Sequence, residues 1–120
     1  MAHKNYTGAS NTGSDNIFIG SDAGINNTSA SGNLFIGSET GKTNSTGASN
    51  LFIGHSAGKY NSNANYNTFI GCFGCGSNST GTNNVFLGYR SGIANTIGIE
   101  NTMIGYYADV SSNNQIIQLQ

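Results

Sequence analysis

The five residues Asn33-Leu-Phe-Ile-Gly37 indicate the fold of this chain, because they and their close variants recur at a fixed interval of seventeen residues. The other copies begin at Asn16, Asn50, Asn67, Asn84 and Asn101. A short apolar segment that is rich in Phe and Ile and closed by Gly is typical of a β-strand followed by a turn. The repeat therefore predicts one short strand in every repeat unit, with no insertion anywhere in the series.

Equivalent positions of the repeat carry the same kinds of residue. The first position is Asn in every copy, the third is Phe or Met, and the fifth is Gly. These columns are Asn16, Asn33, Asn50, Asn67, Asn84 and Asn101; Phe18, Phe35, Phe52, Phe69, Phe86 and Met103; and Gly20, Gly37, Gly54, Gly71, Gly88 and Gly105. A second Asn column runs from Asn27 to Asn95, and a column of Ser or Thr follows it directly. The segment Ser10–Asp15 matches Asn44–Ser49 as half a repeat.

The length of the repeat and its composition predict an all-β fold, a parallel β-solenoid or β-roll. Seventeen residues are too few for a helix pair, and Asn, Gly, Ser and Thr are poor helix formers. Coils stacked in register would lie about 4.8 Å apart. We expect about six rungs over residues 16–112, a half-rung or cap over 1–15, and a cap strand or tail over 113–120. The Phe residues would stack, the Asn side chains would hydrogen-bond between rungs, and the Gly would take positive φ at corners.

Composition excludes several classes of protein. The 120 residues include 18 Gly but no Pro and no three-residue period, which excludes collagen. The net charge of −1 gives no electrostatic basis for binding nucleic acid. No apolar run approaches the ~20 residues of a membrane span. We therefore expect neither a nucleic-acid partner nor insertion of this segment into a membrane.

The predicted strands have two apolar faces. Because neighbouring side chains of a strand point to opposite faces, Leu34 and Ile36 share one face and Phe35 takes the other. One thin coil has only one interior, and the sequence has no loop long enough to cover the second face. We therefore predict that identical copies pack around an axis. Unpaired strand edges at the two ends of the solenoid also suggest end-to-end stacking.

The pattern Asn-x-Phe-Ile-Gly-x-x-Ala-Gly, as in Asn50–Gly58, resembles the head repeats of YadA-type trimeric autotransporter adhesins. Similar repeats occur in trimeric fibre proteins of bacteria and phages. The resemblance spans Ser10 to about Ser112 and implies a left-handed parallel β-roll, assembled as a homotrimer at a cell surface, in the extracellular space or in a virion fibre. The rungs here are longer than the usual head repeat, and Phe stands where that family commonly has a small residue. We therefore expect a wider roll or a different trimer packing.

Candidate residues for metal or redox chemistry are few. Cys72 and Cys75 form a Cys-Phe-Gly-Cys motif, and His55 holds the repeat position of Cys72 one rung away, at about 4.8 Å. The three could supply part of a zinc site, and the two thiols could form a local disulfide. We favour inert thiols at a tight corner, with no metal and no other cofactor. Because no Ser/His/Asp set shares a column, we also expect that the protein is not an enzyme.

The sequence favours a structural and adhesive module that displays weak contacts on a rigid multivalent body. Tyr89, Arg90, Tyr106 and Tyr107 gather near the C-terminal end and are the candidate contacts for a surface glycan or a protein receptor. Two alternatives stay open. One is a subunit that stacks end to end into an extracellular filament. The other is an ice-binding solenoid whose candidate face is the hydroxyl column from Thr28 to Thr96.

Overall fold

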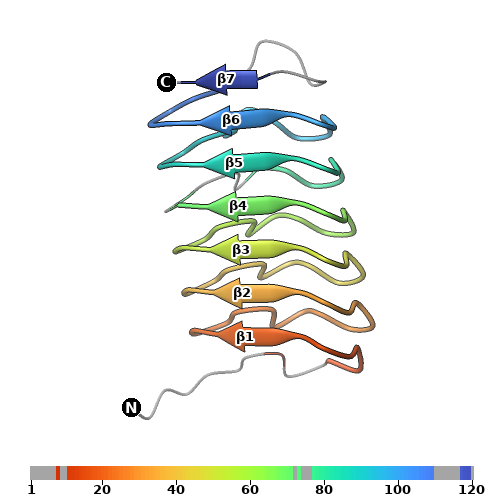
Figure 1. The fold of residues 1–120 in the computed structure, drawn as a ribbon. Coiled ribbons are helices and arrows are strands. Elements are labelled where there is room, and N and C mark those ends of the chain that lie inside the picture. Colours follow the sequence, from red (N-terminus) through yellow and green to blue (C-terminus); the bar gives the residue numbers. More distant parts are fainter. Residues whose placement is uncertain (1–7, 9–10, 72, 74–76, 110–116, 120) are drawn as a thin grey trace.

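The computed structural model describes residues 8, 11–71, 73, 77–109 and 117–119, which form a parallel β-solenoid (Figure 1). Its strands are β1 (Ile17–Ile19), β2 (Leu34–Ile36), β3 (Leu51–Ile53), β4 (Thr68–Ile70), β5 (Val85–Leu87), β6 (Thr102–Ile104) and β7 (Ile117–Leu119). They form one sheet in which strand order follows chain order and all neighbours are parallel. The described residues contain no helix, so the predicted all-β class and solenoid architecture are confirmed.

The register of the sheet reproduces the repeat of the sequence. Each Phe pairs with its equivalent in the next strand, as Phe35 does with Phe52. The pairing of Met103 with Gln118 is the exception, because these two residues are separated by less than a full repeat. In Figure 1 the strands run from right to left across the front, and the chain returns behind them as it rises from β1 to β7. The coil is therefore left-handed, as the resemblance implied.

A ladder of aromatic rings fills the core. Phe35, Phe52, Phe69 and Phe86 are fully buried, with Met103 at the C-terminal end of the ladder and the partly buried Phe18 at the other end. Successive ring centroids lie 4.8–5.0 Å apart, and neighbouring ring planes differ by 4–19°. Such ring pairs each contribute about 0.5–1.5 kcal/mol beyond the area that they bury. The predicted Phe column is thus the apolar core of the solenoid.

Glycine on the opposite wall of the coil makes room for these rings. A Cβ on Gly58 would lie 2.5 Å from the ring of Phe52, and one on Gly41 would meet the ring of Phe35 in the same way. The two glycines also have φ of +59° and +57°, a region that L side chains rarely adopt. In these two rungs the thin coil can therefore hold a Phe because the facing residue has no side chain.

Two ladders of buried asparagines satisfy the polar groups of the interior. In the first, the Nδ2 of Asn61 donates to the Oδ1 of Asn44 (3.0 Å) and to the carbonyl of Ala64 (3.2 Å). The same contacts join Asn27, Asn44, Asn78 and Asn95. In the second, the Oδ1 of Asn33 accepts the backbone N–H of Asn50 (2.9 Å). The side-chain amide suits both ladders because it carries an acceptor and two donors on one short stem.

The N-terminal residues add a partial rung beneath the first coil. The N–H of Gly8 donates to the carbonyl of Ala23, and the N–H of Thr12 donates to the carbonyl of Thr28. Aligning Ser10–Asp15 with Asn44–Ser49 predicts that Ser10 lies below Asn27. In the structure Asn11 holds this position, and its Oδ1 accepts a hydrogen bond from the Nδ2 of Asn27. The shift by one residue extends the amide ladder, which a serine hydroxyl at residue 10 would have interrupted.

Positive φ occurs in four columns of the repeat, and the sequence predicted it only for glycines; one of the four is the column of Gly24, Gly41, Gly58 and Gly92, with φ of 57–68°. The column from Gly20 to Gly105 has φ of 126–146°. Two further columns hold residues other than Gly at φ of 53–61°. The first corner column is Asp22, Glu39, Ser56, Phe73, Arg90 and Tyr107. The second corner column is Asp15, Gly32, Ser49, Tyr66, Asn83 and Glu100, of which only Gly32 is a glycine. For a bulky residue this conformation costs about 1–2 kcal/mol.

We expect Gly37→Ala to destabilise the solenoid by about 3–5 kcal/mol and Gly32→Ala by only about 1 kcal/mol. A Cβ on Gly37, at φ +131°, would lie 2.7 Å from the carbonyl oxygen of Gly54. At Gly32, with φ +74°, the nearest atom is the Oγ of Ser49 at 3.5 Å. Urea unfolding of the two variants measures the difference, and equal losses would contradict this account of the corners.

We expect Asn61→Asp to lose about 2–4 kcal/mol of stability at pH 7, and Asn63→Asp, at an exposed position, to lose almost none. An ionised Asp at residue 61 has no donor and would face the Oδ1 of Asn44 and the carbonyl of Ala64, which accept from Asn61 in the wild type. These two acceptors and the burial of the site raise its folded-state pKa above the usual value of about 3.9. A raised pKa means that stability is recovered as the pH falls through it, because the protonated acid regains a donor. Urea unfolding at pH 4 and pH 7 tests this, and similar losses in the two variants would refute it.

Candidate contact surfaces

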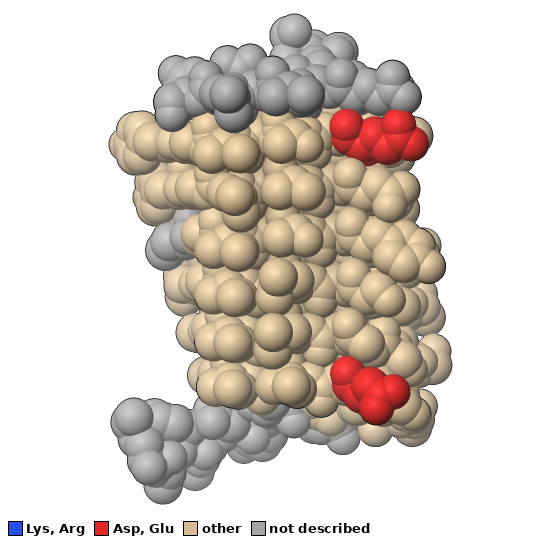
Figure 2. Space-filling view, in the orientation of Figure 1, with Lys and Arg blue, Asp and Glu red and all other residues tan. Residues whose placement is uncertain are grey.

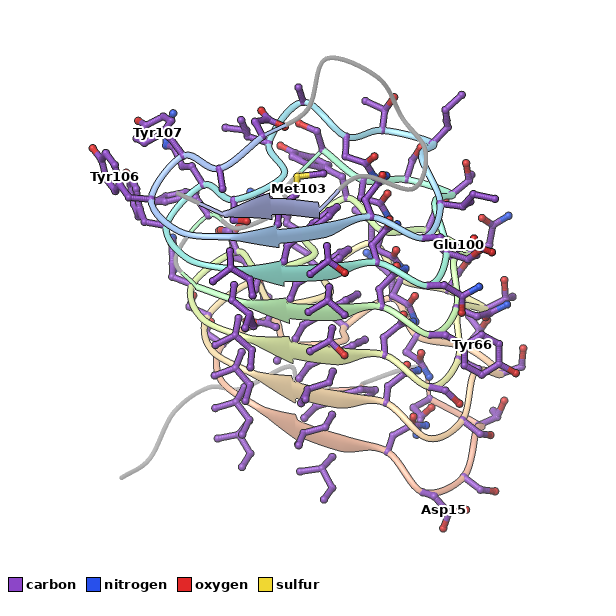
Figure 3. All side chains as sticks on the ribbon, turned by 45° about the horizontal axis from the view of Figure 1, so that its top comes forward. Asp15, Tyr66, Glu100, Met103, Tyr106 and Tyr107 are labelled. Atoms are coloured by element: carbon purple, nitrogen blue, oxygen red, sulfur yellow. The ribbon has the colours of Figure 1, made fainter. Side chains whose placement is uncertain are left out.

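The outer face of the sheet is mainly apolar and carries no charged side chain. Its side chains come from the residues on either side of each ladder residue in β1–β6, and we call this surface the outer sheet face. It consists of Ile17, Ile19, Leu34, Ile36, Leu51, Ile53, Thr68, Ile70, Val85, Leu87, Thr102 and Ile104. Figure 2 looks onto this face and shows no Lys or Arg there, with acidic side chains only along one edge. Figure 3 labels Asp15 and Glu100 at that edge.

The exposure of the outer sheet face confirms the predicted division of the strands. Phe35 is fully buried, whereas Leu34 and Ile36 point outward and are half-buried by their neighbours. At the N-terminal end, Ile17 is 55% exposed and Ile19 is 56% exposed. No described segment crosses in front of these strands in Figure 1. The outer sheet face is therefore open to a partner.

The corner that follows the strands carries a small network of ion pairs in its N-terminal half. Lys42 Nζ lies 3.3 Å from Asp22 Oδ2 and 4.0 Å from Glu39 Oε2, and Lys59 pairs with the same Glu39 oxygen. The hydrogen bond from Lys59 holds the pKa of Glu39 below its ordinary value and raises the pKa of Lys59. Because these side chains keep about a third of their surface in water, the network adds little stability.

The same corner becomes aromatic in the C-terminal half, where Phe73, Tyr89, Arg90, Tyr106 and Tyr107 form what we call the aromatic–arginine patch. The rings of Tyr89 and Tyr106 are nearly parallel, with centroids 5.7 Å apart, and Tyr107 meets Tyr106 edge-on at 4.6 Å. The Arg90 guanidinium lies 5.6–5.8 Å from the ring centroids of Phe73, Tyr89 and Tyr107. Figure 3 shows Tyr106 and Tyr107 projecting from this corner, across the sheet from Tyr66 and Glu100.

The structure brings together all four residues that the sequence selected as contacts, and it adds Phe73. Tyr89, Arg90, Tyr106 and Tyr107 lie on adjacent rungs, as their spacing of one repeat requires. Phe73 was missed because it stands inside the Cys-Phe-Gly-Cys motif, which drew attention to the thiols. Its place one repeat before Arg90 was the signal that could have found it.

Of the three candidate metal ligands, only His55 belongs to the described residues. Its ring meets the edge of Phe73, with centroids 5.0 Å apart and planes at 81°. Cys72 and Cys75 lie outside the part of the chain that the structure describes. Within that part, no group of three or more His, Cys, Asp and Glu side chains is arranged to hold a metal ion. His55 thus extends the aromatic surface toward the N-terminal rungs.

The hydroxyl column from Thr28 to Thr96, which was the candidate ice-binding face, forms hydrogen bonds between rungs. The hydroxyls of Thr28, Ser45, Ser62 and Ser79 each donate to the backbone carbonyl of the next rung at 3.1–3.2 Å. The backbone N–H of each of these residues donates to the same carbonyl. These side chains therefore reinforce the stacking and present only their lone pairs to a ligand.

Comparison with protein-family models, with curated proteins and with solved structures finds nothing that matches this chain. A search of the described residues for a helix long and apolar enough to cross a membrane also finds none. The fold and its exposed surfaces are therefore the basis for assigning a role, and the fold is compatible with a structural repeat module.

We expect Glu39→Gln to cost less than about 1 kcal/mol at low salt, and nothing measurable in about 1 M NaCl, where exposed ion pairs are screened. In the wild-type chain this contribution is present above the unfolded-state pKa of about 4.3 and is lost as the pH falls through the lower folded-state pKa. Urea unfolding at two salt concentrations and at pH 3 and pH 7 measures it. A loss that does not respond to salt would contradict the assignment to ion pairing.

Proposed function

We propose that this chain is the module of a homotrimeric fibre that packs through its outer sheet face and serves in attachment to a surface outside the cell. The outer sheet face is the observation that carries the proposal. It extends over six strands and is apolar except for Thr68 and Thr102, and monomeric proteins rarely leave an extended apolar surface uncovered. The charged side chains of the described residues lie at corners and leave this face free for packing.

The periodicity of the outer sheet face suits a partner with the same period. A second copy of this chain offers the same two columns, mainly Ile and Leu, at the same rung spacing, so side chains of one copy can enter the gaps between rungs of the other. A closed ring of such contacts around an axis satisfies every copy equally. The resemblance to YadA-type heads favours three copies over other numbers.

The proposed role in attachment follows from rigidity and multiplicity. Three solenoids in a ring would present three aromatic–arginine patches at the same height, and weak contacts at each would reinforce one another. No catalysis is needed for this role. The buried polar side chains that the structure describes are mainly amides hydrogen-bonded into ladders, and those amides serve the fold.

End-to-end stacking into a filament is the second candidate, and the order of the sheet favours it. β1 and β7 are the two edge strands, and all strands are parallel. The β7 edge of one copy could therefore extend the sheet of the next copy at its β1 edge without reversing direction. The ice-binding alternative gains no such support, because its hydroxyl column donates to the next rung instead of to a ligand.

Light scattering on the intact chain at micromolar concentration tests the proposal. We expect the wild type to have three times the chain mass of 12.4 kDa. Ile53→Lys, in the middle of the outer sheet face, should give a folded species with the mass of a single chain, because a buried unpaired charge opposes association. Thr80→Lys, at an exposed position outside that face, should remain trimeric.

Two results would overturn the trimer. A monomeric wild type would show that the outer sheet face is stable in water without a partner. Large species whose mass grows with concentration, and which persist in Ile53→Lys, would indicate the end-to-end filament instead.

A further inference from the structure

Folding stability does not explain the residues of the aromatic–arginine patch. Phe73, Arg90 and Tyr107 belong to the first corner column and have φ of 53–55°, a conformation that costs about 1–2 kcal/mol for a bulky residue. Burial of these rings offsets little of this conformational cost, because Phe73 is 40% exposed and Tyr107 is 43% exposed. In the N-terminal rungs the same column holds the smaller or acidic residues of the ion-paired half. These side chains are exposed, have a strained backbone and differ in chemistry from the N-terminal residues of the same column. Such a combination points to a role in binding.

The charge of Arg90 is not neutralised within the described residues. Lys42 and Lys59 both pair with carboxylates of this corner, whereas no ion pair of the described part includes Arg90. Its Nε is enclosed and has no hydrogen-bond partner there, and its guanidinium is held among three rings. A guanidinium is cationic at any physiological pH, and a hydrogen bond with Tyr89 and the neighbouring tyrosines raise the pKa of Arg90 further. An anionic group is the natural complement of this arrangement.

We propose that the aromatic–arginine patch binds a sugar that carries a carboxylate, such as a uronic acid residue of a surface glycan. A guanidinium binds a carboxylate through two parallel hydrogen bonds. The faces of tyrosine rings accept the C–H side of a pyranose, and their hydroxyls can bond to its hydroxyls. This inference rests on the proposed role in attachment and names the class of ligand.

The shape of the patch favours a glycan over a peptide. Binding sites for protein partners usually centre on aromatic side chains in well-packed, desolvated surroundings. Here Tyr106 is 67% exposed and projects with Tyr107 from a corner (Figure 3). Tyr89 and Tyr106 are nearly parallel on successive rungs, with centroids 5.7 Å apart. That separation is comparable with the length of one sugar residue in a chain, so a glycan can lie along the corner.

Titration of the intact chain, followed by NMR, tests the proposal with three matched probes. Methyl β-D-glucuronide carries both the ring and the carboxylate, methyl β-D-glucoside carries only the ring, and acetate carries only the carboxylate. We expect the glucuronide to shift the side-chain signals of Arg90, Tyr106 and Tyr107 with a Kd in the millimolar range. The other two probes should bind at least about tenfold more weakly, a difference of about 1.4 kcal/mol.

Substitutions then separate the two parts of the site. Arg90→Gln should abolish the preference for glucuronide over glucoside, and Tyr106→Ala should weaken glucuronide binding by about tenfold or more. Tyr66→Ala is the matched control, because Tyr66 is equally exposed, at 64%, but lies across the sheet from the patch. It should leave both affinities unchanged.

Several results would overturn the proposal. They are equal binding of glucuronide and acetate, equal binding of glucuronide and glucoside, no binding, or loss of binding in Tyr66→Ala. Binding of a poly-glutamate peptide as tightly as a uronic acid oligomer would identify a peptide site instead. The mass of each sample separates this inference from the proposed assembly. A trimer that ignores glucuronide refutes the ligand alone, and a monomer that binds it refutes the assembly alone.

Discussion

Each buried amide of the first Asn ladder hydrogen-bonds to the same amide one coil away, and this contact sets how successive coils stack. It requires equivalent residues to lie one rung apart, which a constant repeat provides over the first six strands. The same spacing brings each Phe ring onto the next at 4.8–4.9 Å in the middle of the ladder. A single inserted residue would break both ladders, because it would turn the strand over.

A coil this thin cannot build a conventional core, so polar and apolar stacking share the interior. The rings of the Phe ladder supply the buried apolar surface, and glycines such as Gly58 leave room for them. The asparagines satisfy backbone groups that would otherwise be buried without partners. The low apolar content of the sequence is therefore consistent with a stable fold, since one large side chain per coil is enough when it meets its own copy above and below.

Stacking constrains the inward columns strictly and the outward columns only weakly. The inward positions keep Asn, Phe and Gly in nearly every rung, while the first corner column changes from Asp22 and Glu39 to Arg90 and Tyr107. The chemistry of this solenoid therefore changes along its axis without any change of fold. Ion pairs occupy one half of the corner and aromatic rings the other, on a backbone that stays the same from rung to rung.

Sequence alone is enough to predict the first six strands, their register, the Phe and Asn ladders and the glycine corners, because a strict period makes each residue the neighbour of its own equivalent. It also selected Tyr89, Arg90, Tyr106 and Tyr107. The positive φ of the non-glycine corners, the rung-to-rung hydrogen bonds of the hydroxyl column and the contact of Phe73 with Arg90 became visible only in the folded chain. Those features depend on the course of the backbone within each coil. The repeat shows which residues lie above one another in successive coils, but it does not show how the chain bends within a coil.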